Sequence, residues 1–241
     1  HILKRQMSNG AWSYGNENAS SAPDGDTSMT QYSILGMWEA GAGAGVNVPK
    51  EAWDRTAQWL FKNQNGDGGF VYHPGKNKES THTMTVASLG SLYICQGELG
   101  GKRRTTRGGI LQTVQDEGEK NEARVKAVSS PSQFDDAIDR ATKWLAANLT
   151  FDKPSGESDN GRTRYPYYYL YAFERFATLA DIKQINGIDW YAEGSRFILS
   201  KQRDDGSWHA DDGTEVNTAF AVLVLVRSTH ITKKIHQRRI G

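Results

Sequence analysis

One short motif occurs three times in this chain and constrains its fold more than any other feature. The motif is a glutamine, three residues, a glycine, one residue and an aromatic side chain, at residues 6–12, 64–70 and 202–208. Recurrence in a fixed frame is typical of repeat proteins, whose units bury apolar surface against their neighbours. The sequence therefore predicts a repeat protein with a shared structural joint. The joint residues are Gln6, Gly10 and Trp12, then Gln64, Gly68 and Phe70, then Gln202, Gly206 and Trp208.

A fourth unit lies in the long gap between the second and third copies of the motif. Residues 139–149, DRATKWLAANL, match residues 54–64, DRTAQWLFKNQ, with Trp144 over Trp59. Leu149 stands where the glutamine would be, and no Gly-x-Trp follows it. This unit keeps the helical pattern and lacks the motif.

Each unit continues with a second and more apolar segment. These segments begin near Met29, Met84, Tyr167 and Thr218, and their apolar residues recur at three- and four-residue intervals, which indicates helices. The preceding segment of a unit is amphipathic, as a helix on the outside should be. We expect an all-α fold of four hairpins, each an outer helix followed by an inner helix, curling around an axis.

The hairpins are expected to form a single domain over residues 1–241. The units span about 1–45, 50–97, 134–182 and 190–230, and a charged surface insertion spans about 98–133. The basic cluster of that insertion, residues 102–107, and the basic end, residues 233–239, are interpreted as solvated. Small and polar residues favour such surface excursions.

Composition excludes several classes of function. A net charge of +1 gives no general attraction to nucleic acid, and no apolar run is long enough to span a membrane. The single cysteine, Cys95, excludes an internal disulfide and a multi-cysteine zinc site, and its apolar surroundings indicate a buried thiol. We predict a soluble chain with neither a metal nor a cofactor. HILKRQ is not a signal peptide and resembles the last turn of a helix, so we expect a mature or truncated product, with export left open.

The glycines of the motif have a mechanical explanation. Gly10, Gly66 and Gly206 each follow an Asn or Asp directly after a helix, where positive φ would end the helix with a left-handed cap. The glutamine amide would then bond freed backbone groups, and the aromatic side chain would cover the turn. A phosphate cradle is not favoured, because in such cradles the glycines precede a helix.

The motif also resembles that of a known family. ILSKQRDDGSW and WLFKNQNGDGGF resemble the QW motif of squalene-hopene and oxidosqualene cyclases. The paired-helix period is similar to the prenyltransferase and squalene-oxidase repeat of the α/α-toroid superfamily, over most of the chain outside residues 97–133. The resemblance implies an α/α toroid, partial or complete, in which the motif is structural. It also implies a central cavity for a small-molecule, lipid-like or glycan ligand.

The catalytic residues of those families do not carry over. The cyclases use an Asp-x-Asp-Asp acid, and the nearest match here, residues 24–27, lacks one aspartate. Protein prenyltransferases hold zinc with Asp, Cys and His, whereas Cys95 lies in an apolar helix. The Asp-Asp-x-x-Asp pattern at residues 135–139 resembles a magnesium motif but opens an outer helix, where acids suit the dipole. No catalytic residue is therefore assigned.

A polar rim is expected where the inner helices begin, because equivalent positions of a curved array converge on one side. The offset of 55 residues (30 to 85) places Glu79 at the position of Asp24, and the offset of 188 (30 to 218) places Asp212 there. Helix capping is the favoured explanation for any single member, and the rim is supported by the recurrence over several repeats. The candidate rim comprises Asp24, Asp26, Thr27, Glu79, His82, Tyr168, Asp212, Glu215 and Asn217.

Two functions are consistent with these patterns. The missing acid and zinc ligands favour a ligand-binding, partner-binding or scaffold domain that kept the toroid. The alternative is an enzyme acting in the central cavity, similar to terpenoid cyclases and prenyltransferases or to polysaccharide lyases. Four hairpins need not close a ring, so a partner chain or an N-terminal segment missing from this chain would complete it.

Overall fold

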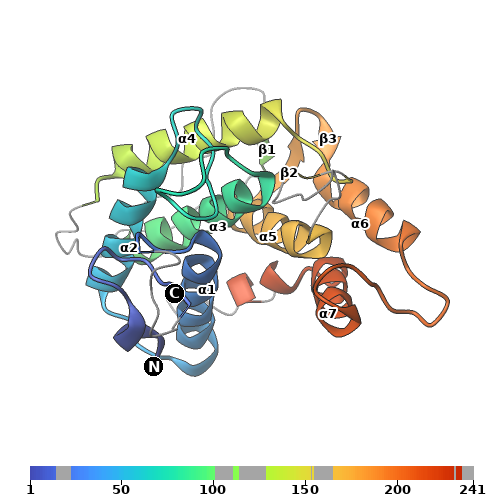
Figure 1. The fold of residues 1–241 in the computed structure, drawn as a ribbon, viewed down its shortest axis with the longest axis horizontal. Helices are drawn as coiled ribbons and strands as arrows, with labels where there is room; N and C mark the ends of the chain where they lie inside the picture. Colours follow the sequence, from blue (N-terminus) through green and yellow to red (C-terminus); the bar gives the residue numbers. More distant parts are fainter. Residues whose placement is uncertain are drawn as a thin grey trace.

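Helices dominate the computed structural model, as the sequence predicts (Figure 1). It describes residues 1–14, 23–100, 111–113, 129–152, 154, 165–230 and 232–234. These residues contain a short 3-10 helix, η1, and seven α helices. The bounds are Ile2–Arg5 for η1, Thr27–Ala44 for α1, Lys50–Asn63 for α2, His82–Glu98 for α3, Pro131–Ala147 for α4, Pro166–Leu179 for α5, Trp190–Ser200 for α6 and Thr214–Leu225 for α7.

The helices form an inner row and an outer row. Helices α1, α3, α5 and α7 pack in this order, each against the next, and α2, α4 and α6 lie outside them (Figure 1). Helix α3 is the centre of the core, since every residue from 82 to 96 is buried. The alternation of amphipathic outer and apolar inner helices is confirmed for α2 to α7.

A small sheet departs from the all-α prediction. Strands β1 (Leu111–Thr113), β2 (Ile182–Ile185) and β3 (Ile188–Asp189) form an antiparallel sheet in this order. Asn186 and Gly187 join β2 to β3 with φ values of 52° and 76°, and two positive values are what a two-residue type I′ hairpin turn requires. The Asn-Gly pair was the sequence signal, hidden between two helical patterns. Apart from β1, most of the expected insertion lies outside the described residues, its basic cluster included.

The repeated motif builds the same turn three times. In each copy the glutamine amide donates to the glycine carbonyl, at 3.1, 2.8 and 3.0 Å. The backbone N–H of the aromatic residue donates to a threonine hydroxyl at 3.0 Å in every copy. These threonines are Thr30, Thr85 and Thr218, the positions that the offsets of 55 and 188 residues relate. The hydrogen bonds thus support the alignment of the units.

The backbone conformation corrects one detail of the predicted joint. Gln6 and Gln64, which end η1 and α2, are extended, so neither helix ends in a left-handed glycine cap. In the second copy the positive φ belongs to Gly68 and not to Gly66. The glycine therefore closes the turn four residues after the glutamine that ends the helix. The motif glycines with positive φ are Gly10, Gly68 and Gly206.

The motif also joins each unit to the next, a role that the sequence did not reveal. The amide of Gln6 donates to the carbonyl of Ala52 in α2 at 2.9 Å. The amide of Gln64 donates to the carbonyl of Ala137 in α4 at 2.8 Å. Among the described residues, the amide of Gln202 bonds only within its own turn. The first two copies are therefore joints between units, whereas no outer helix of the described residues bonds to the third.

Close backbone approach explains why the first two joints need glycine. A Cβ on Gly10 would lie 2.2 Å from the carbonyl oxygen of Arg55, and one on Gly68 would lie 2.6 Å from that of Arg140. Both distances are impossible for a side chain, so only glycine allows the outer helix to approach. The atom nearest to a Cβ on Gly206 would be 3.9 Å away. The third glycine is required by its φ alone.

Loss of the glutamine should lower the free energy of unfolding more in the second copy of the motif, which is a joint, than in the third copy, which is not. We expect Gln64→Leu to lower the free energy of unfolding by about 2 kcal/mol, because two carbonyls in a partly buried joint lose their donor. Gln202→Leu, at an exposed turn, is expected to cost less than about 1 kcal/mol. Urea denaturation followed by circular dichroism measures both values. Equal losses would contradict the role as a joint.

Candidate functional site

The beginnings of three inner helices lie together on one face, which we call the axial face. The ring of Tyr32 in α1 stacks on that of Tyr168 in α5, with centroids 5.6 Å apart. Tyr168 in turn lies 5.9 Å from Phe220 in α7. Residues separated by more than 130 positions therefore meet where α1, α5 and α7 start.

Two of the predicted rim residues, Asp26 and Thr27, stabilise the beginning of α1. Asp26 is buried and caps the helix, accepting hydrogen bonds from the backbone of Met29 at 2.8 Å and from the hydroxyl of Ser28 at 2.7 Å. The hydroxyl of Thr27 donates to the carbonyl of Val71 at 2.7 Å. These contacts are the capping role that the sequence offered as the alternative.

Asp26 also contacts His73, which sequence reasoning missed. Nε2 of His73 lies 2.9 Å from Oδ2 of Asp26, across 47 residues of sequence, and the imidazole is partly exposed. The ring also lies 4.2 Å from that of Tyr72. A buried carboxylate that orients a partly exposed imidazole is an arrangement that can serve proton transfer. No sequence pattern relates the two residues, so only the fold could bring them together.

His82 does not join the face formed by Tyr32 and Tyr168. Its Nε2 contacts the carbonyl of Asn148, and its ring lies edge-on to Trp144 at 5.2 Å. Its side chain therefore packs against the end of the outer helix α4.

The other acidic rim candidates lie in the loops before the inner helices or at their first turn. Asp24, Glu79, Asp212 and Glu215 are all exposed. Burial of part of the Asp212 side chain, followed by the neighbouring charge of Asp211, raises the pKa of Asp212. Asp212 lies within electrostatic reach of Tyr32, because its charge is among those that raise the pKa of that phenol. The acidic rim remains a prediction.

Asn217 of α7 is a rim candidate whose side chain is buried. Its amide nitrogen donates to the carbonyl of Gly213 at 2.5 Å. Its Oδ1 has no hydrogen-bond partner in the part of the chain that the structure describes. The side chain thus shares the Gly213 carbonyl with its own backbone N–H and leaves one acceptor unused.

An aromatic cluster occupies the axial face and surrounds an arginine. We define this cluster as Tyr32, Tyr168, Tyr171, Phe220 and Arg175. The rings of Tyr171 and Phe220 lie 5.3 Å apart. Cζ of Arg175 lies 4.1 Å from the ring centre of Tyr171 and 6.0 Å from that of Tyr32. The guanidinium therefore sits against aromatic faces contributed by α1 and α5.

The polar groups of this cluster are incompletely bonded. Arg175 is only 2% exposed, and its Nη1 and Nη2 have no hydrogen-bond partner among the described residues. The amide nitrogen of Gln31 donates to the hydroxyl of Tyr168 at 3.0 Å, whereas its Oε1 is also without a partner. Buried donors and acceptors are nearly always bonded in proteins, so these atoms require an explanation.

Burial keeps the phenols of the cluster neutral. It raises the pKa of Tyr32 and of Tyr168 above the ordinary tyrosine value. The nearby charge of Arg175 lowers both values, but by less than burial raises them. Neither hydroxyl is therefore suited to act as a base near neutral pH.

The segment that follows α7 forms hydrogen bonds to both α5 and α1. Thr229 donates to Oε2 of the buried Glu174 at 2.5 Å, and Thr232 donates to Oε2 of Glu39 at 2.9 Å. Nζ of Lys233 donates to the carbonyl of Thr178 at 3.0 Å and is buried. The prediction that residues 233–239 are solvated is therefore wrong for Lys233. Residues 235–239 of that tail lie outside the described residues.

The remaining chemical candidates have structural explanations. Asp136 and Asp139 of the Asp-Asp-x-x-Asp pattern are exposed and pair with Arg140 at 4.0 Å and Lys143 at 3.1 Å. No group of His, Cys, Asp and Glu in the described ranges could hold a metal ion. Cys95 is buried, and burial raises the pKa of its thiol. A reactive thiol is therefore not supported.

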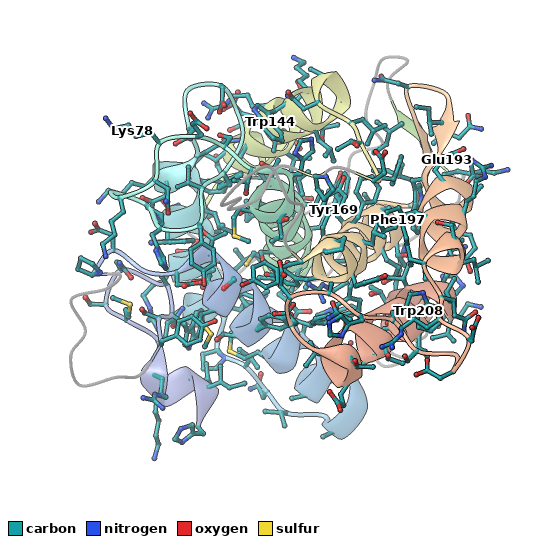
Figure 2. All side chains as sticks on the ribbon, turned by 45° about the vertical axis from the view of Figure 1, so that its right-hand side comes forward. Lys78, Trp144, Tyr169, Glu193, Phe197 and Trp208 are labelled. Carbon is teal, nitrogen blue, oxygen red and sulfur yellow. The ribbon has the colours of Figure 1, made fainter. Side chains whose placement is uncertain are left out.

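A shallow depression of about 500 Å³ lies away from the cluster, between α5 and the end of α6. Tyr167, Phe197, Lys201 and His209 contribute to its lining. In Figure 2, Phe197 lies between these two helices, whereas Glu193 of α6 points outward. The aromatic run of α5 is thus divided, with Tyr168 and Tyr171 in the aromatic cluster and Tyr167 against Phe197.

The fourth unit exposes apolar side chains at positions whose counterparts in the second unit are packed. Leu199 of α6 is 56% exposed, although its counterpart Phe61, at the offset of 138 residues, packs on Phe134 of α4 with ring centres 5.0 Å apart. Val222 and Val226 of α7 are 44% and 55% exposed. Their counterparts in α1 and α3 are Ile34, Leu89, Trp38 and Tyr93, which are at most 4% exposed. We define the end face as Leu199, Gln202, Gly206, Val222 and Val226.

Comparison with known proteins assigns no family to this chain. No protein-family model matches it, and no curated protein matches it. None of the described helices is long and apolar enough to cross a membrane. The described residues define a helical repeat protein, and its function must be inferred from the axial face and the end face.

The buried Glu174 predicts a pH-dependent stability. Burial raises the pKa of its carboxyl group, so the folded protein binds this proton more tightly than the unfolded chain does. Its contribution therefore favours folding at low pH and declines as pH rises through the raised pKa. We expect Glu174→Gln to gain stability relative to the original protein as pH rises above about 4.3, the ordinary glutamate value. Thermal unfolding at several pH values measures this difference.

The exposed Glu51 of α2 provides the matched control. Glu51→Gln removes a carboxyl group from the surface, and its change in stability with pH should be smaller than that of Glu174→Gln. Equal changes for the two variants would contradict the raised pKa of Glu174.

Proposed function

We propose that this chain is a partner-binding scaffold domain, an α/α toroid built of prenyltransferase- and squalene-cyclase-like repeats. Its end face receives a further outer-inner helix pair of the same kind. The observation that supports this proposal is the exposure of Leu199, Val222 and Val226. Of their counterparts in the second unit, Phe61 packs on α4, and Leu89 and Tyr93 are buried. Terminal repeats that stop without a polar cap leave such an interface open.

The two joints inside the chain indicate what the end face should bind. In the second joint, Phe61, Gln64 and Gly68 all contact the next outer helix, α4. Leu199, Gln202 and Gly206 occupy the same three positions at the end face. The end face therefore continues an interface that the chain already forms twice.

The outer helices that accept these joints share a short pattern. Alanine, two residues, arginine and a small residue occur in α2 as residues 52–56 and in α4 as residues 137–141. The alanine carbonyl accepts from the glutamine, and the arginine carbonyl approaches the glycine. The arginine side chain also reaches back, as Nη2 of Arg140 donates to the carbonyl of Asn65 at 3.2 Å. The expected partner is an amphipathic helix with Ala-x-x-Arg-small.

A second copy of this chain fits the end face poorly. Its α2 and α4 already accept joints of their own. Its α6 carries Trp190, Glu193 and Gly194 at the three positions of the pattern. It therefore lacks the alanine and the arginine. A helix from another polypeptide segment fits the pattern better than α6 does.

A stapled, fluorescein-labelled helix with the sequence of α4 is a suitable probe. Fluorescence anisotropy should show binding to the full chain and at least about tenfold weaker binding to Leu199→Glu, because a charge replaces a contact of about 2 kcal/mol. Val46→Glu, at an exposed apolar residue outside the end face, is the matched control and should bind normally. A probe carrying Ala137→Phe should not bind.

Two results would overturn the proposed partner. One is absence of probe binding to a chain that stays monomeric in analytical ultracentrifugation. The other is self-association that Leu199→Glu abolishes, which would make a second copy the occupant.

An enzyme acting at the axial face is the second candidate, favoured by the contact between Asp26 and His73. The Asp-x-Asp-Asp acid of the cyclases is incomplete here, because Thr27 stands where its last aspartate would be. We therefore expect no cyclic product from squalene or a linear diphosphate, as measured by product analysis. Cyclic products that disappear in Asp26→Asn would favour the enzyme.

A further inference from the structure

We propose that Arg175 and the aromatic cluster bind a carboxylate carried on an apolar or aromatic body. This ligand would enter from the axial face as Tyr32 moves aside. The site is separate from the end face and does not depend on the proposed partner.

The buried guanidinium is the first argument. Arg175 is 2% exposed, and its Nη1 and Nη2 have no hydrogen-bond partner among the described residues. Burying a charge without a partner is strongly unfavourable. The two nitrogens of the guanidinium fork match the two oxygens of a planar carboxylate. A bound carboxylate would therefore satisfy the atoms that the folded chain leaves unbonded.

The charge of Arg175 acts on two carboxyl groups, those of Glu174 and Glu39, which already accept hydrogen bonds from other residues. Glu174 accepts from Thr178 and Thr229, and Glu39 accepts from Thr232. The positive charge of Arg175 acts on both carboxyl groups without a hydrogen bond to either. No carboxyl group in the described part of the chain therefore competes with a bound anion for Nη1 and Nη2 of Arg175.

The aromatic walls define the body of the ligand. The ring of Tyr171 lies 4.1 Å from Cζ of Arg175, and Phe220 lies 5.3 Å from Tyr171. Such faces favour a flat or apolar group beside the carboxylate. The free Oε1 of Gln31 can accept a hydrogen bond from a hydroxyl or amide of the ligand.

Tyr32 is the movable part of the site. It is 37% exposed, whereas its stacking partner Tyr168 is buried. Because Nη1 and Nη2 of Arg175 are shielded from solvent, an anion reaches them only after a side chain moves. Rotation of a partly exposed side chain is fast and small in scale. Tyr32 therefore acts as the cover of the guanidinium.

Charge favours a carboxylate over a phosphate. The guanidinium of Arg175 gives the cluster one positive charge. Two acids lie within electrostatic reach of the cluster, because the charge of Arg175 acts on Glu39 and the charge of Asp212 acts on Tyr32. A single negative charge balances Arg175, while a dianion would add repulsion from these acids. We therefore expect inorganic phosphate not to compete.

The test compares 2-naphthoate with its neutral isostere 2-naphthamide by isothermal titration calorimetry on the full chain. We expect the carboxylate to bind at least about tenfold more tightly, as charge-assisted hydrogen bonds imply. Arg175→Met should lose this preference. It should also unfold at or above the temperature of the original protein, because an apolar side chain replaces an unpaired buried charge. A purely structural role for Arg175 predicts a lower unfolding temperature instead.

Further variants keep the test decisive. Arg175→Lys retains the charge without the fork, so the preference should fall about tenfold even if Arg175→Met does not fold. Tyr32→Ala should strengthen naphthoate binding, because it removes the side chain that covers the guanidinium. Leu199→Glu should not alter it, which separates this site from the proposed partner interface.

Three outcomes would overturn the proposal. They are equal affinity for naphthoate and naphthamide, displacement of naphthoate by inorganic phosphate, and a preference for the carboxylate that survives in Arg175→Met. Absence of binding by either compound would also reject it, while leaving the partner interface untouched.

Discussion

Contact between a motif glycine and the next outer helix is the constraint on which the array depends. A missing Cβ at Gly10 and Gly68 lets the carbonyls of Arg55 and Arg140 come within a distance that no other residue allows. The preceding glutamine can then reach the neighbouring helix as well. Because the same turn also binds a threonine of the inner helix, one short segment fixes outer helix, inner helix and next unit together.

Hydrogen bonding distinguishes two buried charged side chains, Asp26 and Arg175. Asp26 is buried and accepts from a backbone N–H, a hydroxyl and an imidazole, so its burial is compensated within the fold. Arg175 is buried to a similar degree and has no such partner at Nη1 or Nη2. Folding alone explains the first residue and not the second. A ligand accounts for the difference.

Helix α7 takes part in both inferred surfaces. Its Phe220 forms a wall of the aromatic cluster, while its Val222 and Val226 belong to the end face. The segment that follows it crosses to α5 and α1 through Thr229 and Thr232. The two surfaces therefore share one helix, although they lie on different residues and bind by different chemistry.

The sequence by itself determined the repeats, the alternation of amphipathic and apolar helices and the joint at the glutamine motif, because these depend on local periodicity and turn chemistry. It also held an unused signal for the hairpin at Asn186 and Gly187. Only the tertiary structure decided that His82 faces Trp144, that Asp26 meets His73 and that Arg175 is buried without a partner. Those outcomes depend on side-chain directions between helices far apart in the chain, which repeat spacing does not specify.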